Sequence, residues 1–234
     1  MAITTFTRLT AKDPSANLLD EGSAAGKAFI ATIDDALAQK ACLRVHYGRE
    51  VEDESNYWVF AEWNSVPDRL AYVQSSAFQS VSKSLFEHVD SSKVLSKHFT
   101  PSEKLNSPAA FFAADGLGAI EVLSLHFPDD LSDTDKAESE RLWKEFQDKG
   151  LDTSPALRGG VAGGWSVEKD VPVLGDGSGE GIALMLLLGW TSVEAHTANR
   201  ETKAFLEAVP FLLEHMPRRC GLFMCHVKPI TRSK

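Results

Sequence analysis

The feature that most constrains this chain is that its sequence contains one pattern twice. When the sequence is shifted by 127 positions, Trp63 aligns with Trp190, and Glu87-His88 aligns with Glu214-His215. Nine of the 26 positions from 63 to 88 are then identical without a gap, whereas average residue usage gives about one or two by chance. A shift of 128 aligns His98 with His226. We interpret this pattern as a duplication, so both halves should share one fold.

The expected order of secondary structure is the same in each half. Apolar residues spaced by three or four predict helices, and short runs rich in Val, Tyr and Trp predict strands. The first half predicts a strand (3–10), a helix (24–39), two strands (42–47, 57–63), a helix (66–88) and a strand (94–99). The second half predicts a strand (120–127), a helix (132–149, ended by Gly150), two strands (161–167, 182–189), a helix (193–215) and a strand (222–227). This is the β-α-β-β-α-β order of ferredoxin-like α+β domains, one spanning residues 1–108 and the other 109–234.

One strand indicates how the two domains are expected to meet. The segment 183–188, Ala-Leu-Met-Leu-Leu-Leu, is apolar at every position. A strand with one face in water would alternate apolar and polar residues, so this strand should be covered on both faces. We therefore expect two four-stranded sheets that face each other, with helices outside.

Two segments of the sequence resemble a known family. The stretch from Glu62-Trp63 through Val66 to Ala77-Phe78, and its counterpart from Gly189-Trp190 to Ala204-Phe205, are similar to the strand-to-helix signature of antibiotic biosynthesis monooxygenase domains. In that superfamily two ferredoxin-like protomers join their sheets into a dimeric α+β barrel. The resemblance implies that a tandem duplication here supplies both halves of the barrel within one chain.

The resemblance alone does not select a reaction. The superfamily includes cofactor-independent oxygenases of aromatic polyketides, haem-degrading oxygenases, polyketide cyclases, isomerases and stress-response proteins without clear activity, and a fold is compatible with many functions. The haem-degrading members carry a proximal His four residues after the Phe of the helix motif. Ser82 and Val209 stand there in this sequence, which argues against haem.

Composition and charge exclude several other classes. The net charge is −9, which argues against a nucleic-acid partner or an anionic membrane surface. The sequence contains no apolar stretch near the 20 residues that a membrane helix needs, and it begins without a signal-peptide pattern. Its three cysteines (Cys42, Cys220, Cys225) form neither a disulfide framework nor a zinc motif, so we expect a cytoplasmic protein without a metal site.

The two halves differ in a way that places the main pocket in the first. Under the 127-residue shift, Tyr57-Trp58-Val-Phe60-Ala-Glu62 becomes Leu-Met-Leu-Leu-Leu-Gly. Flat aromatic rings suit flat ligands, so the candidate substrate-binding residues are Tyr57, Trp58, Phe60, Trp63 and Tyr72. The repetition of Trp63 as Trp190 is also what simple core packing would produce.

The candidate catalytic residues are Glu62, His46 and His98. A buried Glu62 should have a raised pKa or pair with Arg44 or His46, and it could take a proton from a phenol or from carbon next to a carbonyl. Alternatively, Glu62 lies at the strand end and faces water. Imidazole exchanges protons near neutral pH, although the recurrence of His98 as His226 also fits a shared structural hydrogen bond.

These observations favour a small-molecule enzyme of secondary metabolism that resembles cofactor-independent monooxygenases. Its substrate would be an aromatic or polyketide-like molecule, and dioxygen would react directly with a deprotonated substrate, without metal or flavin. A cyclase, isomerase or dehydratase, and a non-catalytic ligand-binding or stress-response protein, remain alternatives. Because the duplication supplies the usual dimer contact, we expect a monomer (a pseudo-dimer) or a homodimer.

Overall fold

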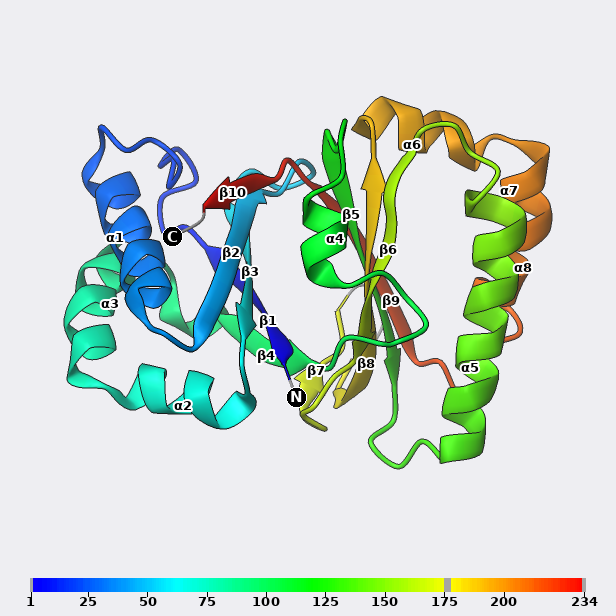
Figure 1. Cartoon of the computed structure of the whole chain (residues 1–234), viewed down its shortest axis with the longest axis horizontal. Helices are drawn as coiled ribbons and strands as arrows, with labels where there is room; N and C mark the ends of the chain where they lie inside the picture. Colours follow the sequence, from blue (N-terminus) through cyan, green and yellow to red (C-terminus); the bar gives the residue numbers. More distant parts are fainter. Residues whose placement is uncertain (1, 175–177, 233–234) are drawn as a thin grey trace. The chain divides into compact units, whose positions relative to one another are not determined.

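The computed structural model describes residues 2–174 and 178–232 and divides the chain into two compact units (Figure 1). The first unit contains residues 1–101 and 227–234, and the second contains residues 102–226. This division by contacts assigns residues 102–108 to the second unit and residues 227–234 to the first, whereas the boundary at 108/109 follows the sequence repeat. No helix among the described residues has the length and apolar character needed to cross a membrane.

The first unit is a ferredoxin-like α+β unit. Its elements are β1 (Ile3–Thr10), α1 (Ala24–Ala38), β2 (Cys42–Arg49), β3 (Asn56–Trp63), α2 (Val66–Gln74), α3 (Ser76–His88), β4 (Leu95–Phe99) and the C-terminal β10 (Ile230–Arg232). The strand order is β10-β2-β3-β1-β4, and each pairing is antiparallel. Helices α1, α2 and α3 lie on one side of this sheet (Figure 1).

The second unit repeats this topology. Its elements are α4 (Pro108–Phe112), β5 (Ala119–Phe127), α5 (Asp133–Phe146), β6 (Leu157–Trp165), β7 (Val171–Pro172), β8 (Glu180–Trp190), α6 (Val193–Arg200), α7 (Lys203–Ala208), α8 (Pro210–Leu213) and β9 (Gly221–Val227). The order β6-β8-β5-β9 matches β2-β3-β1-β4, with β7 added beside β8. The predicted fold class, α+β with two tandem ferredoxin-like domains, is confirmed.

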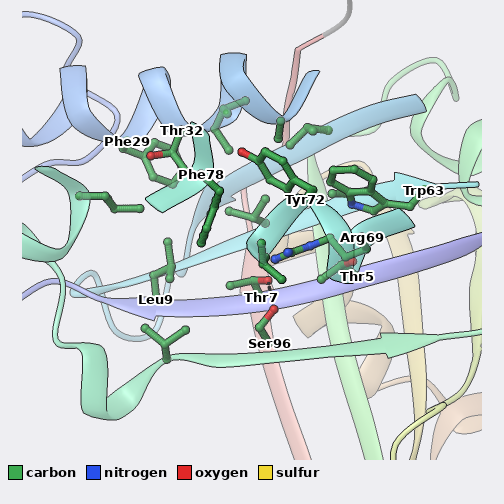
Figure 2. A pocket seen from close by; sticks show the side chains of 18 of the residues that line it. Thr5, Thr7, Leu9, Phe29, Thr32, Trp63, Arg69, Tyr72, Phe78 and Ser96 are labelled. Carbon is green, nitrogen blue, oxygen red and sulfur yellow. Dashed lines mark hydrogen bonds between the residues drawn. The ribbon is translucent and has the colours of Figure 1, made fainter. Parts of the chain in front are cut away.

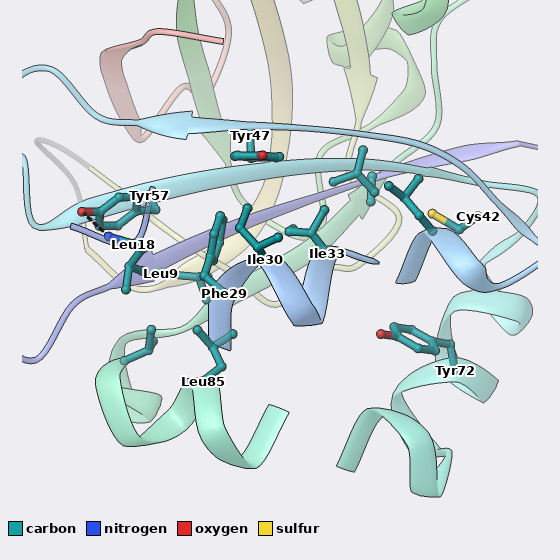
Figure 3. Packing of buried hydrophobic residues seen from close by; sticks show 14 of the residues in the cluster. Leu9, Leu18, Phe29, Ile30, Ile33, Cys42, Tyr47, Tyr57, Tyr72 and Leu85 are labelled. Atoms are coloured by element: carbon teal, nitrogen blue, oxygen red, sulfur yellow. Dashed lines mark hydrogen bonds between the residues drawn. The ribbon is translucent and has the colours of Figure 1, made fainter. Parts of the chain in front are cut away.

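Each unit has its own hydrophobic core between its sheet and its helices. In the first unit, Phe29, Ile30 and Ile33 from α1 belong to the same buried cluster as Tyr57 of β3 (Figure 3). The Phe29 ring lies 6.2 Å from the Tyr57 ring and meets the Tyr47 ring edge-on at 5.4 Å. In the second unit, every residue of β8 from Gly181 to Trp190 is buried, as its unbroken apolar run predicts. Burial of large apolar side chains is the main stabilising contribution to each unit.

The observed helices differ from the predicted ones in their continuity and in where one of them ends. The segment 66–88 is two helices, because the Ser75 hydroxyl accepts a hydrogen bond from Phe78 N and caps α3. The segment 193–215 is three helices, with Thr202 capping α7 and Pro210 beginning α8. Gly150 does not end the helix that precedes it, since a π-helical turn continues from Gln147 to Leu151.

Candidate functional site

A cavity of about 350 Å³ lies inside the first unit, between the sheet and helices α1, α2 and α3 (Figure 2). Such a volume falls within the range of small-molecule pockets. Aromatic lining side chains include Phe29, Trp63, Tyr72 and Phe78, and aliphatic groups fill much of the remaining wall. The cavity is therefore shaped and lined for an apolar ligand with a flat body.

The alternation of side chains along the strands decides which residues reach this cavity. Thr5 pairs with Ala61 on one side and with His98 on the other, so these three residues share the face that points toward the helices. Trp63 lies two residues beyond Ala61 and shares that face. The helices cover this face, and α2 adds Arg69 and Tyr72 to the lining.

The rings of Trp63, Tyr72 and Phe78 form a continuous aromatic wall. The Trp63 and Tyr72 rings stack with centroids 5.3 Å apart, and the Tyr72 and Phe78 rings meet edge-on at 5.1 Å. The Tyr72 hydroxyl donates a hydrogen bond to Asp35 Oδ2 at 2.9 Å. Burial, followed by this hydrogen bond, raises the pKa of Tyr72, so its phenol stays neutral at physiological pH.

The guanidinium of Arg69 lies against this wall. Its Cζ atom is 5.7 Å from the Trp63 ring centroid, 5.8 Å from that of Tyr72 and 5.9 Å from that of Phe78. These distances are typical of cation–π contacts. Burial lowers the pKa of Arg69, yet a guanidinium remains charged at neutral pH. The cavity thus contains a permanent positive charge.

The structure divides the predicted site residues between the two faces of the first sheet. Trp63, Tyr72 and His98 line the cavity. Tyr57 shares the helix-facing side, but its hydroxyl donates to Ala16 O at 3.0 Å and accepts from Leu18 N at 3.1 Å, within the core.

Glu62, His46, Trp58 and Phe60 lie on the opposite face. Glu62 Oε2 accepts a hydrogen bond from Arg44 Nη1 at 3.1 Å, and His46 Nε2 lies 3.8 Å from Glu62 Oε1. The predicted pairing of Glu62 with Arg44 is therefore confirmed.

The aromatic side chains of this opposite face have structural partners. The Trp58 and Phe60 rings are nearly parallel, with centroids 6.0 Å apart. Trp58 Nε1 donates to Glu50 Oε2 at 3.0 Å, and the same carboxylate accepts from Arg8 Nε at 3.0 Å. These contacts join β1, β3 and the turn after β2.

Two residues that line the cavity were not indicated by the sequence. Arg69 occupies a helical position that resembles a solvated charge, and Thr5 lies in a weakly alternating strand. The 127-residue shift aligns Arg69 with His196, and this replacement of one basic residue type by another is the only signal that the sequence offers. Among residues 2–174 and 178–232, no group of three or more His, Cys, Asp or Glu side chains is arranged to hold a metal ion.

Comparison with known proteins gives a family match in this same unit. The model of the family "Antibiotic biosynthesis monooxygenase" matches residues 23–84. Residues 23–84 are therefore similar to the domains of that family. The match runs from the start of α1 into α3 and so includes the helices and strands that form most of the cavity.

Solved structures are similar to the chain over nearly its whole length. The structure of an anthrone oxidase-like protein has a TM-score of 0.63 at 17% identity, covering 99% of this chain and 93% of its own. A candidate monooxygenase from Fusobacterium nucleatum has a TM-score of 0.58 at 9% identity, covering 100% and 98% of the two chains. One from Lactobacillus acidophilus has a TM-score of 0.56 at 10% identity, covering 99% and 96%. These likenesses support the two-unit fold. A search of curated proteins found no significant match.

Proposed function

We propose that this protein is a small-molecule monooxygenase that oxidises an aromatic, polyketide-like substrate in the cavity of its first unit. The observation that supports this function most directly is the aromatic cavity itself, which lies within the unit that matches the monooxygenase family model. Anthrone-type phenols have the flat, conjugated shape that such a wall would stack against. The anthrone oxidase-like protein among the similar structures makes these phenols the first substrates to test.

His98 is the proposed general base, because it lines the cavity. Imidazole exchanges protons near neutral pH. Removal of a proton from the activated CH₂ group of an anthrone would give a carbanion that conjugation stabilises. The carbanion adds to dioxygen, and protonation gives a hydroperoxide. Loss of water from the hydroperoxide leaves a carbonyl group, so one oxygen atom enters the product and the other leaves as water.

Two aromatic residues of the cavity wall would position the substrate. Trp63 would stack against it, and Tyr72, held by Asp35, fixes the wall of the cavity. A neutral phenol at Tyr72 would not compete with the substrate for the base.

The test is oxygen uptake and product formation by the purified protein with an anthrone-type phenol. We expect wild-type turnover, and we expect His98→Asn to lower kcat by about 100-fold or more, the usual loss when a general base is removed. His88→Asn, at the end of α3 and outside the cavity lining, is the matched control and should keep wild-type turnover. Absence of both oxygen uptake and product would overturn the proposal.

Two other outcomes would identify the alternative functions. Product formation that continues without oxygen would indicate a cyclase, isomerase or dehydratase reaction at the same base. Tight binding without turnover, unchanged in His98→Asn, would indicate a ligand-binding protein.

A further inference from the structure

The charge of Arg69 is not balanced within the cavity. The guanidinium contacts three aromatic rings, but no ion pair joins it to a carboxylate anywhere in the described part of the chain. Arg69 is half-buried, and aromatic rings stabilise a cation at such a site less than an anion does. A cation in this position therefore favours a negatively charged ligand.

Two further polar groups lie at the same end of the cavity. Trp63 Nε1 and Thr5 Oγ1 are buried, and neither has a hydrogen-bond partner among the described residues. Both residues line the cavity, and Figure 2 shows Thr5, Trp63 and Arg69 grouped together, away from the apolar end around Leu9. Buried polar groups are normally paired, and a donor left unpaired beside a cavity is a place where a ligand acceptor fits.

The second unit shows which side chains occupy the equivalent positions. Trp63 pairs with Ile3, and Trp190 pairs with Ala119, so the strand registers make Glu121 the equivalent of Thr5. Trp190 Nε1 donates to Glu121 Oε2 at 3.0 Å.

The cation of the first unit also has an equivalent in the second. Arg69 lies six residues after Trp63, and His196 lies six residues after Trp190, so the two occupy equivalent positions. The His196 ring stacks on the Trp190 ring, with the centroids 4.6 Å apart. His196 Nε2 lies 3.4 Å from Glu121 Oε2. In the second unit, Glu121 therefore supplies a carboxylate to the Trp and the basic residue of this group. The first unit has Thr5 at the equivalent position and so supplies no carboxylate there.

We infer that the first cavity binds a flat conjugated ligand carrying one negatively charged oxygen, which Arg69, Trp63 Nε1 and Thr5 Oγ1 hold where the second unit has Glu121. The apolar end of the cavity takes the ring system, and the charged oxygen lies at the Arg69 end. A phenolate and a carboxylate both have the required chemistry. The inference concerns the same site as the proposed monooxygenase function and specifies the ligand charge.

The test compares the binding of three naphthalene probes of the same shape by calorimetry at low salt and pH 8. 2-Naphthoate is charged, 2-naphthamide is neutral, and 2-naphthol ionises as the pH rises. We expect 2-naphthoate to bind roughly 10 to 100 times more tightly than 2-naphthamide, as charge-assisted hydrogen bonds to a guanidinium allow. If the natural ligand is a phenolate, 2-naphthol binding should strengthen as the pH rises and exceed that of 2-naphthoate.

Two variants and a control isolate the role of Arg69. Arg69→Gln should remove the preference for the charged probe. Arg44→Gln, which removes an arginine from the opposite face of the same sheet, should leave that preference unchanged. Thr5→Glu copies the second unit and should abolish 2-naphthoate binding, because its carboxylate would occupy the oxygen site.

The possible outcomes separate this inference from the proposed function. Equal binding of 2-naphthoate and 2-naphthamide, or a preference that survives Arg69→Gln in folded protein, would overturn the inference even if oxygen uptake is observed. An Arg69-dependent preference in a protein that never consumes oxygen would support the inference and reject the monooxygenase function.

Discussion

Glu62 and Trp63 are neighbours in the sequence, yet their side chains project from opposite faces of the first sheet. Trp63 lines the cavity, whereas Glu62 accepts a hydrogen bond from Arg44 on the other face. If the cavity is the site of reaction, Glu62→Gln should keep turnover within about threefold of wild type, while His98→Asn should lose the roughly 100-fold or more that a general base contributes. Steady-state kinetics on both variants, with circular dichroism to check folding, provides the comparison.

The opposite result would also be informative. A loss from Glu62→Gln as large as that from His98→Asn would place the proton transfer on the face that contains Glu62, His46 and Trp58. That was one of the possibilities that the sequence left open.

At the residue scale, the sequence identified residues that line the cavity better than it predicted which face of the sheet each one occupies. Trp63, Tyr72 and His98 are uncommon residue types that stand out, and all three line the cavity. Alternation along a strand shows which residues share a face of the sheet. Which of the two faces the helices cover depends on the packing of the core, and alternation alone does not show it. In β3 nearly every residue is buried, so the burial pattern does not distinguish the two faces. The sequence does not indicate Arg69 or Thr5, because neither residue type is unusual in a surface helix or a strand.

At the element scale, strand order was predictable and helix continuity was not. The apolar spacing of Leu70, Val73 and Leu85 continues across Ser75, so periodicity alone predicted one helix over 66–88. The cap at Ser75 interrupts it. Strand β10 was also missed, because its three residues are too few for a periodic pattern, and it exists through pairing with β2.

Gly48 of β2 allows this C-terminal segment to approach. A Cβ atom at position 48 would lie 2.1 Å from Lys228 O and 2.6 Å from Val227 Cγ1. We expect Gly48→Ala to displace residues 227–232 and to lower the free energy of unfolding by about 1 to 3 kcal/mol, as overpacking usually does. Urea denaturation measures the loss, and faster trypsin cleavage after Arg232, detected by mass spectrometry, reports the displaced segment.

Gly22→Ala is the matched control for this prediction. There the added Cβ would meet only the Asp20 side chain, which can move. Equal stability and equal protease resistance in Gly48→Ala would show that the close approach at Gly48 does not matter for holding β10.

At the scale of the whole molecule, the two units use one topology for different purposes. The first unit keeps a cavity with an unbalanced Arg69, whereas the second fills the equivalent region with a buried polar cluster of Glu121, Trp190, His196 and His226. His196 Nδ1 and His226 Nε2 lie 2.7 Å apart, so one ring donates a hydrogen bond to the other. A neutral imidazole pair makes this bond, and a doubly protonated pair does not.

This cluster should make the stability of the chain sensitive to acid. Burial is the main cause that lowers the pKa of His196 from 6.5 to about 3, and the neighbouring His226 and Arg200 act in the same direction. The nearby Glu121 carboxylate opposes this shift. In the unfolded chain His196 binds a proton below about pH 6.5, whereas in the folded chain it stays neutral down to about pH 3. The free energy of unfolding therefore decreases as the pH is lowered from about 6.5 to about 3.

The expected loss is about 1.4 kcal/mol per pH unit for this one proton, or about 2 kcal/mol between pH 7 and pH 5. Urea denaturation of wild type and His196→Gln at both pH values measures it. The variant should be less stable at pH 7, because the bond to His226 is lost, but its decrease between pH 7 and pH 5 should be smaller by about 2 kcal/mol. His215→Gln, at an exposed position, should keep the wild-type decrease. The contrary result would be a wild type that becomes more stable on acidification while His196→Gln does not. Attraction between Glu121 and a protonated His196 would then outweigh the effect of burial. The second unit would hold a buried ion pair similar in charge to the one proposed for Arg69 and its ligand.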